Sequence, residues 1–357
     1  MPEINNKIIN DALKKGKLEK RTEEITYYRF KEDLGKIPRG TVVLKDRAIF
    51  GFPHIKRIFI LGKGITRNIK SDDICIEEKI DGYNLRIAYV NGKIFAFSRG
   101  GFIDFFATEK AREIINKKFF SDFPNYVLCC EMIGNTPYTK PVNGYDVKLF
   151  VFDINNGKGD YLDCNERYTS LKKYGIESVP IIAKLKKNET KKIRNIALNL
   201  LKGKKEGMVI KSRDRKDIVK FVTPFADIDD ISNNTTLMFD MPLGFFNQRV
   251  LRSAFFIKDF ELDHTKFVQE LGNAFYEKFI SKLEALEIGE EISEEFEILI
   301  KDAGIFNWVK RHMSREVKIE KIFEREENGK TRIRFRKIYK RTNRELKNYL
   351  NGGGVTD

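Results

Sequence analysis

The strongest constraint on the fold is a run of three β-rich segments between Ile74 and Phe106, separated by two glycine turns. Asp81-Gly82 stands between the first two segments, and Asn91-Gly92 stands between the second and the third. Asp-Gly and Asn-Gly are favoured in two-residue hairpin loops, because both loop residues take positive φ. The run therefore predicts adjacent antiparallel strands in a β-rich core.

The strand pairing can be counted if both turns are two-residue loops. The second turn sets Asn84 opposite Arg99. The first turn sets Lys79 opposite Asn84, a weaker inference because a functional loop there could be wider. Cross-strand partners share a face of the sheet, so the pairing predicts that one face carries Lys79, Asn84, Arg86 and Arg99.

Lys79 is the candidate nucleophile of this face. A lysine amine attacks only when it is neutral, and its ordinary pKa of about 10.4 disfavours that form at neutral pH. Nearby cations lower the pKa of a lysine, and Arg86 and Arg99 would supply such a field. Gly82 would permit the tight turn that exposes the lysine. The alternative is a surface turn whose lysine and arginines are solvated.

Further short motifs follow Lys79–Arg86 in a fixed order. They are Ser98–Gly101, the CEMIG segment with Glu131, the FVFDI segment with Phe152 and Asp153, the EGMVIK segment with Glu206 and Lys211, and the IVKFV segment with Lys220. This series resembles the covalent nucleotidyltransferases, which comprise ATP- and NAD-dependent ligases and mRNA-capping enzymes. The K-x-D-G-x-N-x-R form is similar to that of RNA ligases. The flanking segments GFPHIKRI, KFVTPFADIDDI and DMPLGFFNQRVLRSAFF resemble those of archaeal, homodimeric, RNA-circularising ATP-dependent RNA ligases.

The resemblance implies that the first motif is catalytic. It implies that Lys79 takes AMP from ATP and releases diphosphate, with Asp81, Gly82 and Arg86 in the same catalytic motif. It implies that Arg99 lies near the nucleotide sugar and the 5′-phosphate of the RNA.

The resemblance also implies a nucleotide site and a metal site. Asn84 is expected among the nucleotide-binding residues, and Glu131 is expected to accept hydrogen bonds from the ribose hydroxyls. Phe152 is expected to stack on adenine, although Phe150 could do so instead. Glu206 is expected to help to hold Mg²⁺ (or Mn²⁺), whose hard character suits carboxylate and phosphate oxygens.

Two lysines are expected at the α-phosphate, where they would stabilise the charge that develops during transfer. They are Lys211 and Lys220. Many family members carry two lysines spaced two apart in the last motif, whereas Ile218 occupies the first of these positions here. The division of the phosphate contacts between Lys211 and Lys220 therefore stays open.

The fold class implied by the resemblance is α+β. It is an antiparallel, β-rich nucleotidyltransferase core of the ATP-grasp-like ligase type, with a small N-terminal region and helical plus α/β C-terminal domains. The expected domains are residues 1–65 (N-terminal), 66–225 (adenylation), 226–290 (helical, dimerisation) and 291–357 (C-terminal α/β). The PFADIDD segment after Thr223 is interpreted as a linker, and Glu327–Lys330 as the turn of a final hairpin.

Composition agrees with a basic, globular protein. The formal net charge of +15 favours phosphate-bearing partners. No segment has the roughly 18 consecutive apolar residues that a membrane span requires, and the N-terminus lacks a secretory signal, so we expect a cytoplasmic protein without a membrane partner. The four cysteines form no C-x-x-C pair and are expected to be reduced, buried thiols.

The predicted function is ATP-dependent RNA ligation in three in-line displacements. Lys79 is adenylylated, AMP moves to the 5′-phosphate of single-stranded or nicked RNA, and a 3′-hydroxyl displaces AMP. A homodimer and intramolecular circularisation are expected. The alternatives are an ATP-dependent DNA ligase, a GTP-using capping enzyme, an adenylyltransferase that modifies RNA 3′ ends, and a non-catalytic RNA-binding protein that retains the fold. The helices expected after Val222 disfavour the first two, which usually carry an oligonucleotide-binding barrel there.

Overall fold

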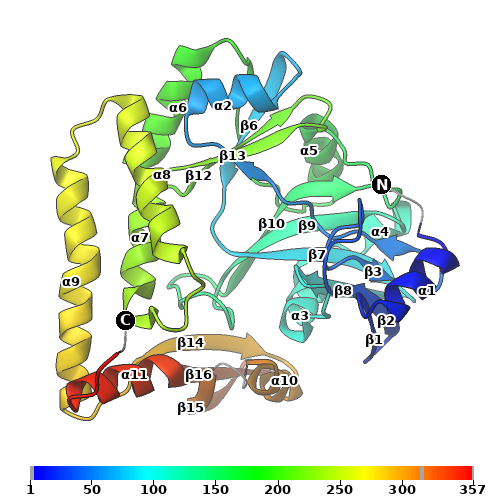
Figure 1. Cartoon of the computed structure of the whole chain (residues 1–357). Coiled ribbons are helices and arrows are strands. Elements are labelled where there is room, and N and C mark those ends of the chain that lie inside the picture. Colours follow the sequence, from blue (N-terminus) through cyan, green and yellow to red (C-terminus); the bar gives the residue numbers. More distant parts are fainter. Residues whose placement is uncertain (1–3, 314–316, 356–357) are drawn as a thin grey trace.

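The computed structural model of the chain describes residues 4–313 and 317–355, in which four β-sheets are surrounded by helices (Figure 1). Among the described strands, β13 and β5 form a parallel pair, and the other paired strands run antiparallel. The predicted α+β class is therefore confirmed. Within the described residues, none of the helices combines the length and the apolar character that crossing a bilayer requires.

The N-terminal part is one helix followed by a small sheet. Its elements are α1 (Asn6–Lys14), β1 (Leu18–Thr22), β2 (Thr26–Phe30), β3 (Val42–Val43) and β4 (Ala48–Ile49). The Asn5 side chain caps α1 by accepting a hydrogen bond from the backbone N–H of Ile8 at 3.1 Å. Tyr27 and Ile49 of this sheet share a hydrophobic cluster with Phe97 of the central region, so the small sheet packs on the core.

Two sheets form the central region. The first has the order β10-β9-β7-β8, with β7 (Tyr83–Val90), β8 (Lys93–Ser98), β9 (Val127–Gly134) and β10 (Val147–Asn155). The second has the order β11-β6-β12-β13-β5, with β5 (Lys56–Arg57), β6 (Asp73–Lys79), β11 (Ile181–Lys186), β12 (Gly207–Ser212) and β13 (Ile218–Val222). Arg86 lies opposite Phe97, and Asn91 and Gly92 have φ of 49° and 81°, so the predicted hairpin at Asn91-Gly92 is confirmed.

The predicted hairpin at Asp81-Gly82 is wrong. Lys79 ends β6 and lies opposite Gly207 of β12, not opposite Asn84, which belongs to the other central sheet. Strand β6 already pairs with β11 on one side and with β12 on the other, so it has no free edge for β7. Asp81 and Gly82 therefore carry the chain from one sheet to the other, and Lys79 and Asn84 do not share a sheet face.

Side chains of the five-stranded sheet alternate between a helix-covered face and a polar face. Ile76, Met208 and Ile210 lie in a hydrophobic cluster with α2 (Leu61–Asn68) and α6 (Thr190–Lys202). Glu77 and Val209, which lie opposite each other, have the opposite orientation and line a cavity. The alternation thus gives the sheet one face for the core and one for a site.

Three helices complete the central region around the four-stranded sheet. They are α3 (Phe105–Ile114), α4 (Lys118–Asp122) and α5 (Cys164–Lys172). The Asp104 side chain caps α3 by accepting a hydrogen bond from the Ala107 N–H at 2.8 Å. The four cysteines are free and buried, as predicted.

The C-terminal part is a set of helices followed by a small sheet and a last helix. Its elements are α7 (Pro224–Asn234), the 3₁₀ helix η1 (Thr235–Leu237), α8 (Phe245–Phe260), α9 (Thr265–Glu287), β14 (Ser293–Ile300), α10 (Gly304–Met313), β15 (Val317–Glu327), β16 (Lys330–Tyr339) and α11 (Lys340–Leu350). The PFADIDD segment is the beginning of α7, so its interpretation as a linker is wrong. Glu327 lies opposite Lys330, which confirms the final hairpin.

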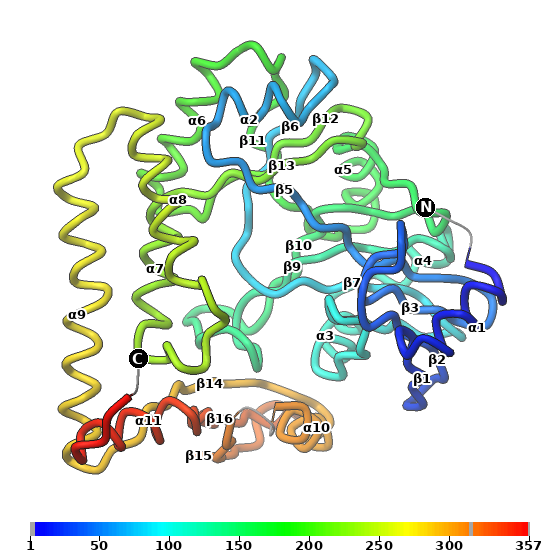
Figure 2. The backbone as a smooth tube through the Cα atoms, viewed as in Figure 1, coloured from blue at the N-terminus to red at the C-terminus, as the bar shows by residue number. Residues whose placement is uncertain are grey.

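The C-terminal sheet packs against helix α3 of the central region, and Figure 2 shows the two next to each other. Ile298, Phe306 and Phe335 share one hydrophobic cluster with Ala107 and Ala111 of α3. The buried Lys110 ammonium, also on α3, contacts the Asp146 carboxylate at 2.7 Å and the backbone carbonyl of Leu299. The last sheet therefore shares a core with the central region.

Candidate active site

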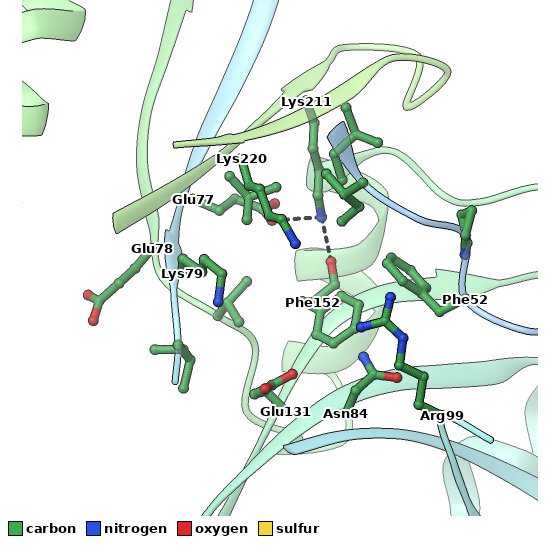
Figure 3. Close-up of a pocket in the computed structure, with 16 residues that line it drawn as sticks. Phe52, Glu77, Glu78, Lys79, Asn84, Arg99, Glu131, Phe152, Lys211 and Lys220 are labelled. Carbon is green, nitrogen blue, oxygen red and sulfur yellow. Dashed lines mark hydrogen bonds and ion pairs between the residues drawn. The ribbon is translucent and has the colours of Figure 1, made fainter. Parts of the chain in front are cut away.

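One cavity lies where the polar face of the five-stranded sheet meets the four-stranded sheet (Figure 3). It brings together these predicted site residues: Lys79, Asn84, Arg99, Glu131, Phe152, Lys211 and Lys220. Their strands belong to both central sheets, so the fold assembles them from segments far apart in the sequence.

Lys79 is held by Glu206 at this cavity. Glu206 directly precedes Gly207, the register partner of Lys79, and its Oε1 forms an ion pair with the Lys79 ammonium. Burial raises the pKa of Glu206 to about 7, although Lys79 opposes the shift. The other carboxylate oxygen, Oε2, is buried and lacks a hydrogen-bond partner within the described residues. This desolvated oxygen fits a hard cation such as Mg²⁺.

Glu131 and Asn84 face the cavity from the opposite sheet. They are register partners on β9 and β7. Burial raises the pKa of Glu131 to about 7, and the Oδ1 atom of Asn84 is buried without a hydrogen-bond partner in the described structure. The Glu131 carboxylate also accepts a hydrogen bond from the Gly82 backbone. A buried amide oxygen without a partner beside a carboxylate is suited to a ligand that offers donors, such as ribose hydroxyls or an amine.

A β-bulge brings Phe152 into the cavity. The register between β10 and β9 shifts between Val151 and Asp153, so Phe152 is the extra residue. Its ring lies edge-on to Phe52, with centroids 4.9 Å apart and an interplanar angle of 81°. Phe150 lies opposite Glu131 but does not line the cavity. The geometry thus favours Phe152 over Phe150 for a stacking role.

Lys211 is buried and fully engaged by protein groups (Figure 3). Its ammonium lies 2.7 Å from a Glu77 oxygen and 3.0 Å from an Asp153 oxygen, and it donates to the Phe152 carbonyl at 2.6 Å. Burial alone would raise the pKa of Asp153, but Arg215 and Lys211 hold that pKa well below its usual range. Since an ammonium has three donors, Lys211 has no donor left for a phosphate without losing one of these contacts.

Lys220 lines the same cavity but, unlike Lys211, has no carboxylate partner among the described residues. It forms no ion pair with another side chain in the described parts of the chain. Burial, together with the neighbouring cations Arg57, Lys79 and Arg99, lowers the pKa of Lys220 to about 8. Lys220 is therefore a partly desolvated cation without a counter-ion, which suits an anionic ligand.

Arg86 lies outside the cavity, and the prediction that it shares a sheet face with Lys79 is wrong. Its fully buried guanidinium donates hydrogen bonds to the backbone carbonyls of Phe50 at 3.0 Å and Ser98 at 2.7 Å, with a longer contact of 3.4 Å to the Ile49 carbonyl. It thus fixes the segment that leads to Phe52. The long side chain reaches these carbonyls because the N-terminal part packs over this face.

Gly82 is required for a reason other than the predicted turn. A Cβ atom at Gly82 would lie 2.3 Å from the Met132 carbonyl oxygen and 2.7 Å from a methyl carbon of Ile133. Strand β9 therefore passes too close for any side chain. Asp81 is exposed and lies outside the cavity.

Sequence reasoning missed Glu77, Arg167 and Phe52. Glu77 bridges Lys211 and Arg167, whose Nη2 atom lies 2.7 Å from Glu77 Oε1, and both partners are almost fully buried. The two-residue alternation of β6 would have given Glu77 the same face as Lys79. Phe52 and Arg167 come from other elements, and no local pattern in the sequence links them to this site.

Two protein families match this chain in succession. Residues 72–222 match the family described as RNA ligase, and residues 234–353 match the family described as Ligase Pab1020 C-terminal region. A relative, the uncharacterized protein MJ0414 of Methanocaldococcus jannaschii, is 32% identical and aligns over 92% of this chain and 89% of its own length.

Solved structures match over nearly the whole chain. An archaeal ATP-dependent RNA ligase (form 2) has a TM-score of 0.89 and 28% identity, covering 99% of this chain and 97% of its own. A protein from Aquifex aeolicus that carries a provisional assignment as an ATP-dependent DNA ligase has a TM-score of 0.92 and 29% identity, covering 99% of this chain and 100% of its own. The residues that meet at the site and the matches with these proteins agree, and the chain belongs to the RNA ligase family.

Proposed function

We propose that this protein is an ATP-dependent RNA ligase that joins 5′-phosphate and 3′-hydroxyl ends through AMP bound covalently to Lys79. The observation that carries the proposal is that Lys79 and Lys220 line one cavity between the two central sheets, and that Glu206 forms an ion pair with Lys79 there. A nucleophile, a carboxylate with an unpaired oxygen and an unpaired cation are the groups that transfer of a nucleotidyl group requires.

Lys79 attacks the α-phosphorus of ATP once its amine has lost a proton. Lys220 neutralises charge on the α-phosphate, because it is the cavity lysine without a protein counter-ion among the described residues. Lys211 acts differently: it holds Glu77, Asp153 and the Phe152 carbonyl together and so fixes the bulge. This division is our proposal for the roles that the sequence left open between Lys211 and Lys220.

The opposite sheet binds the nucleoside. Phe152 stacks on adenine, Glu131 and Asn84 bind polar groups of the nucleoside, and Arg99 binds the 5′-phosphate of the RNA from the rim. Glu206 is the candidate ligand for Mg²⁺ or Mn²⁺, because its Oε2 atom is buried without a partner. A bound divalent ion would supply further charge neutralisation at the phosphates.

The covalent step is tested with ATP that carries ³²P at the α-phosphate. Wild-type protein should acquire a label that survives denaturing electrophoresis, and Lys79→Ala should acquire none. Lys63→Ala, at an exposed position on α2, is the matched control and should label normally. Labelling with GTP instead of ATP would favour a capping enzyme. No label on wild-type protein from which bound AMP has been removed with diphosphate would contradict the proposal.

The substrate is tested with matched single-stranded RNA and DNA that carry a 5′-phosphate and a 3′-hydroxyl. We expect sealed RNA, and circles among the products. The structural match to a protein provisionally assigned to the DNA ligases makes the DNA arm informative. Efficient sealing of nicked DNA alone would overturn the RNA assignment, and adenylylated ends without sealing would favour an end-modifying adenylyltransferase.

The functional unit that we propose is a homodimer. The resemblance implies dimerisation through the C-terminal region, and α9 exposes Val268 (61%), Tyr276 (73%) and Ile280 (51%). Monomeric proteins rarely leave several apolar side chains of one helix so exposed without a binding role.

A further inference from the structure

Arg57 occupies a position that the motifs do not assign. It lies on β5, at the edge of the five-stranded sheet, and is the register partner of Lys220 on β13 (Figure 2 shows β5 beside β13). Register partners share a face of the sheet, so Arg57 emerges on the same face as Lys220, next to the cavity rather than among the residues that line it. Its neighbour Lys56 has the opposite orientation, and the Lys56 ammonium donates to Asn68 of α2 at 3.2 Å.

The Arg57 guanidinium is partly desolvated and unsatisfied. Its Nε atom is buried without a hydrogen-bond partner, and Arg57 forms no ion pair with any described side chain. Burial lowers its pKa, and the charges that act on it include Asp227 and Glu206. These carboxylates already contact other cations: Asp227 pairs with Arg252, and Glu206 pairs with Lys79. An arginine held in this state is suited to an anion that arrives with a substrate.

The order of the strands relates Arg57 to the reaction. The strands follow one another in the order β6, β12, β13 and β5. Lys79 lies on β6, Lys220 on β13 and Arg57 on β5, so Lys220 stands between the other two across the sheet. In an in-line displacement the leaving group departs on the side opposite the nucleophile. With the α-phosphate at Lys220, a group leaving away from Lys79 would meet Arg57 next.

We propose that Arg57 binds the β- and γ-phosphates of ATP and neutralises the diphosphate as it leaves. As the Lys79 nitrogen bonds to the α-phosphorus, the bond from that phosphorus to the α–β bridging oxygen breaks. The electron pair stays on the diphosphate, and the amine proton passes to solvent. Guanidinium binds such phosphate oxygens in a two-pronged fork, which an ammonium cannot reproduce. The inference rests on the proposed function, because it assigns a residue to the first step of ligation.

Binding provides a test that does not depend on turnover. Calorimetry on the Lys79→Ala background should show that Arg57→Ala weakens ATP binding by about 10- to 100-fold, the effect expected from losing charge-assisted hydrogen bonds. The affinity for AMP should stay within about twofold, because AMP lacks the diphosphate. Arg57→Lys should retain part of the ATP affinity, and Lys56→Ala, which removes the same charge on the other face, should match the parent. An equal loss of ATP and AMP affinity would overturn the proposal.

Step-resolved kinetics separate this inference from the proposed function. In the wild-type background, Arg57→Ala should slow labelling of Lys79 by ATP and release of AMP by added diphosphate. Joining of pre-adenylylated RNA involves no diphosphate, so it should proceed at the wild-type rate. A matching loss in pre-adenylylated joining would assign Arg57 a structural role instead. Failure of the wild-type protein itself to join pre-adenylylated RNA would contradict the ligase function, whatever Arg57 does.

Discussion

Burial brings the pKa values of two carboxylates and one lysine at the site toward 7, upward for the acids and downward for the base. Burial raises the pKa of Glu131 and of Glu206 to about 7, and it lowers the pKa of Lys220 to about 8. The charges of these three side chains therefore depend on pH in a range where ordinary carboxylates and lysines do not titrate.

The alkaline pH dependence of the first step should report Lys220. Below pH 8 its ammonium is charged, and above about pH 8 it becomes neutral and no longer stabilises the α-phosphate. We expect the ratio of kcat/KM for ATP in Lys220→Arg to that in the wild type to rise above pH 8, by up to about tenfold per pH unit, because kcat/KM reports the free enzyme and only the wild type loses this charge. Both proteins use the same nucleophile, so the deprotonation of Lys79 cancels in the ratio. A ratio that does not change with pH would assign the α-phosphate role to another group.

Arg86 should matter for stability before it matters for catalysis. Arg86→Ala leaves buried backbone carbonyls of Phe50 and Ser98 without their donor. We expect a loss of about 3 kcal/mol in the free energy of unfolding, measured with denaturant. A variant that unfolds as the wild type does but fails to label Lys79 would show instead that Arg86 acts in catalysis.

Sequence reasoning succeeded most in selecting individual residues of the site. Lys79, Glu131 and Lys220 each stand in a short motif that can be recognised in the sequence, and all three line the cavity. Arg86 was harder to interpret. The alternation of side chains along β7 gives the face on which Arg86 lies. Its partners, however, include backbone carbonyls of the segment before Phe52, and no pattern in the sequence specifies that this segment packs there.

Strand pairing was predictable only where the chain turns back on itself. The Asn91-Gly92 turn joins adjacent strands, whereas Asp81-Gly82, which looks alike in sequence, joins two sheets. The difference lies in β6, whose two edges pair with β11 and β12, strands that begin 108 and 134 residues after the start of β6. Such non-local pairing competes with the turn signal and cannot be seen in a short window.

The crossing between the sheets should tolerate no side chain at Gly82. In Gly82→Ala the added methyl group would meet the Met132 carbonyl, so β7 and β9 must shift apart. We expect a destabilisation of about 1–3 kcal/mol and a slower Lys79 labelling, because Asn84 and Glu131 lie on the displaced strands. Gly62→Ala is the control: it lies in α2 with open space around its Cβ position and should be neutral or slightly stabilising. Equal stability of the two variants would show that the β9 contact relaxes at no cost.

On the scale of the whole molecule, the C-terminal region has a sheet that packs on the core and a helix, α9, with exposed apolar side chains. Its sheet shares a hydrophobic cluster with α3, and Lys330 reaches Glu113 of α3 at 2.8 Å. Helix α9, by contrast, packs on α7 but leaves several of its apolar side chains exposed, and Val268 and Tyr276 line hollows beside α7 and η1. Residues 291–350 pack against the adenylation region. The contacts therefore do not separate the two expected domains, and the boundaries expected from the sequence stay a prediction.

The exposed apolar side chains of α9 should form the dimer contact. Val268→Lys combined with Ile280→Lys adds two charges to this surface, and burying them in an interface without partners would cost several kcal/mol. We expect the wild type to elute with the mass of a dimer in size-exclusion chromatography with light scattering, and the double variant with the mass of a monomer. Ile114→Lys with Ile322→Lys places the same charges on apolar side chains of α3 and β15 that are 38% and 46% exposed, and this control should stay dimeric. A monomeric wild type would remove the homodimer from the proposed function. Dissociation by the control pair instead would move the interface to the face that carries α3 and β15.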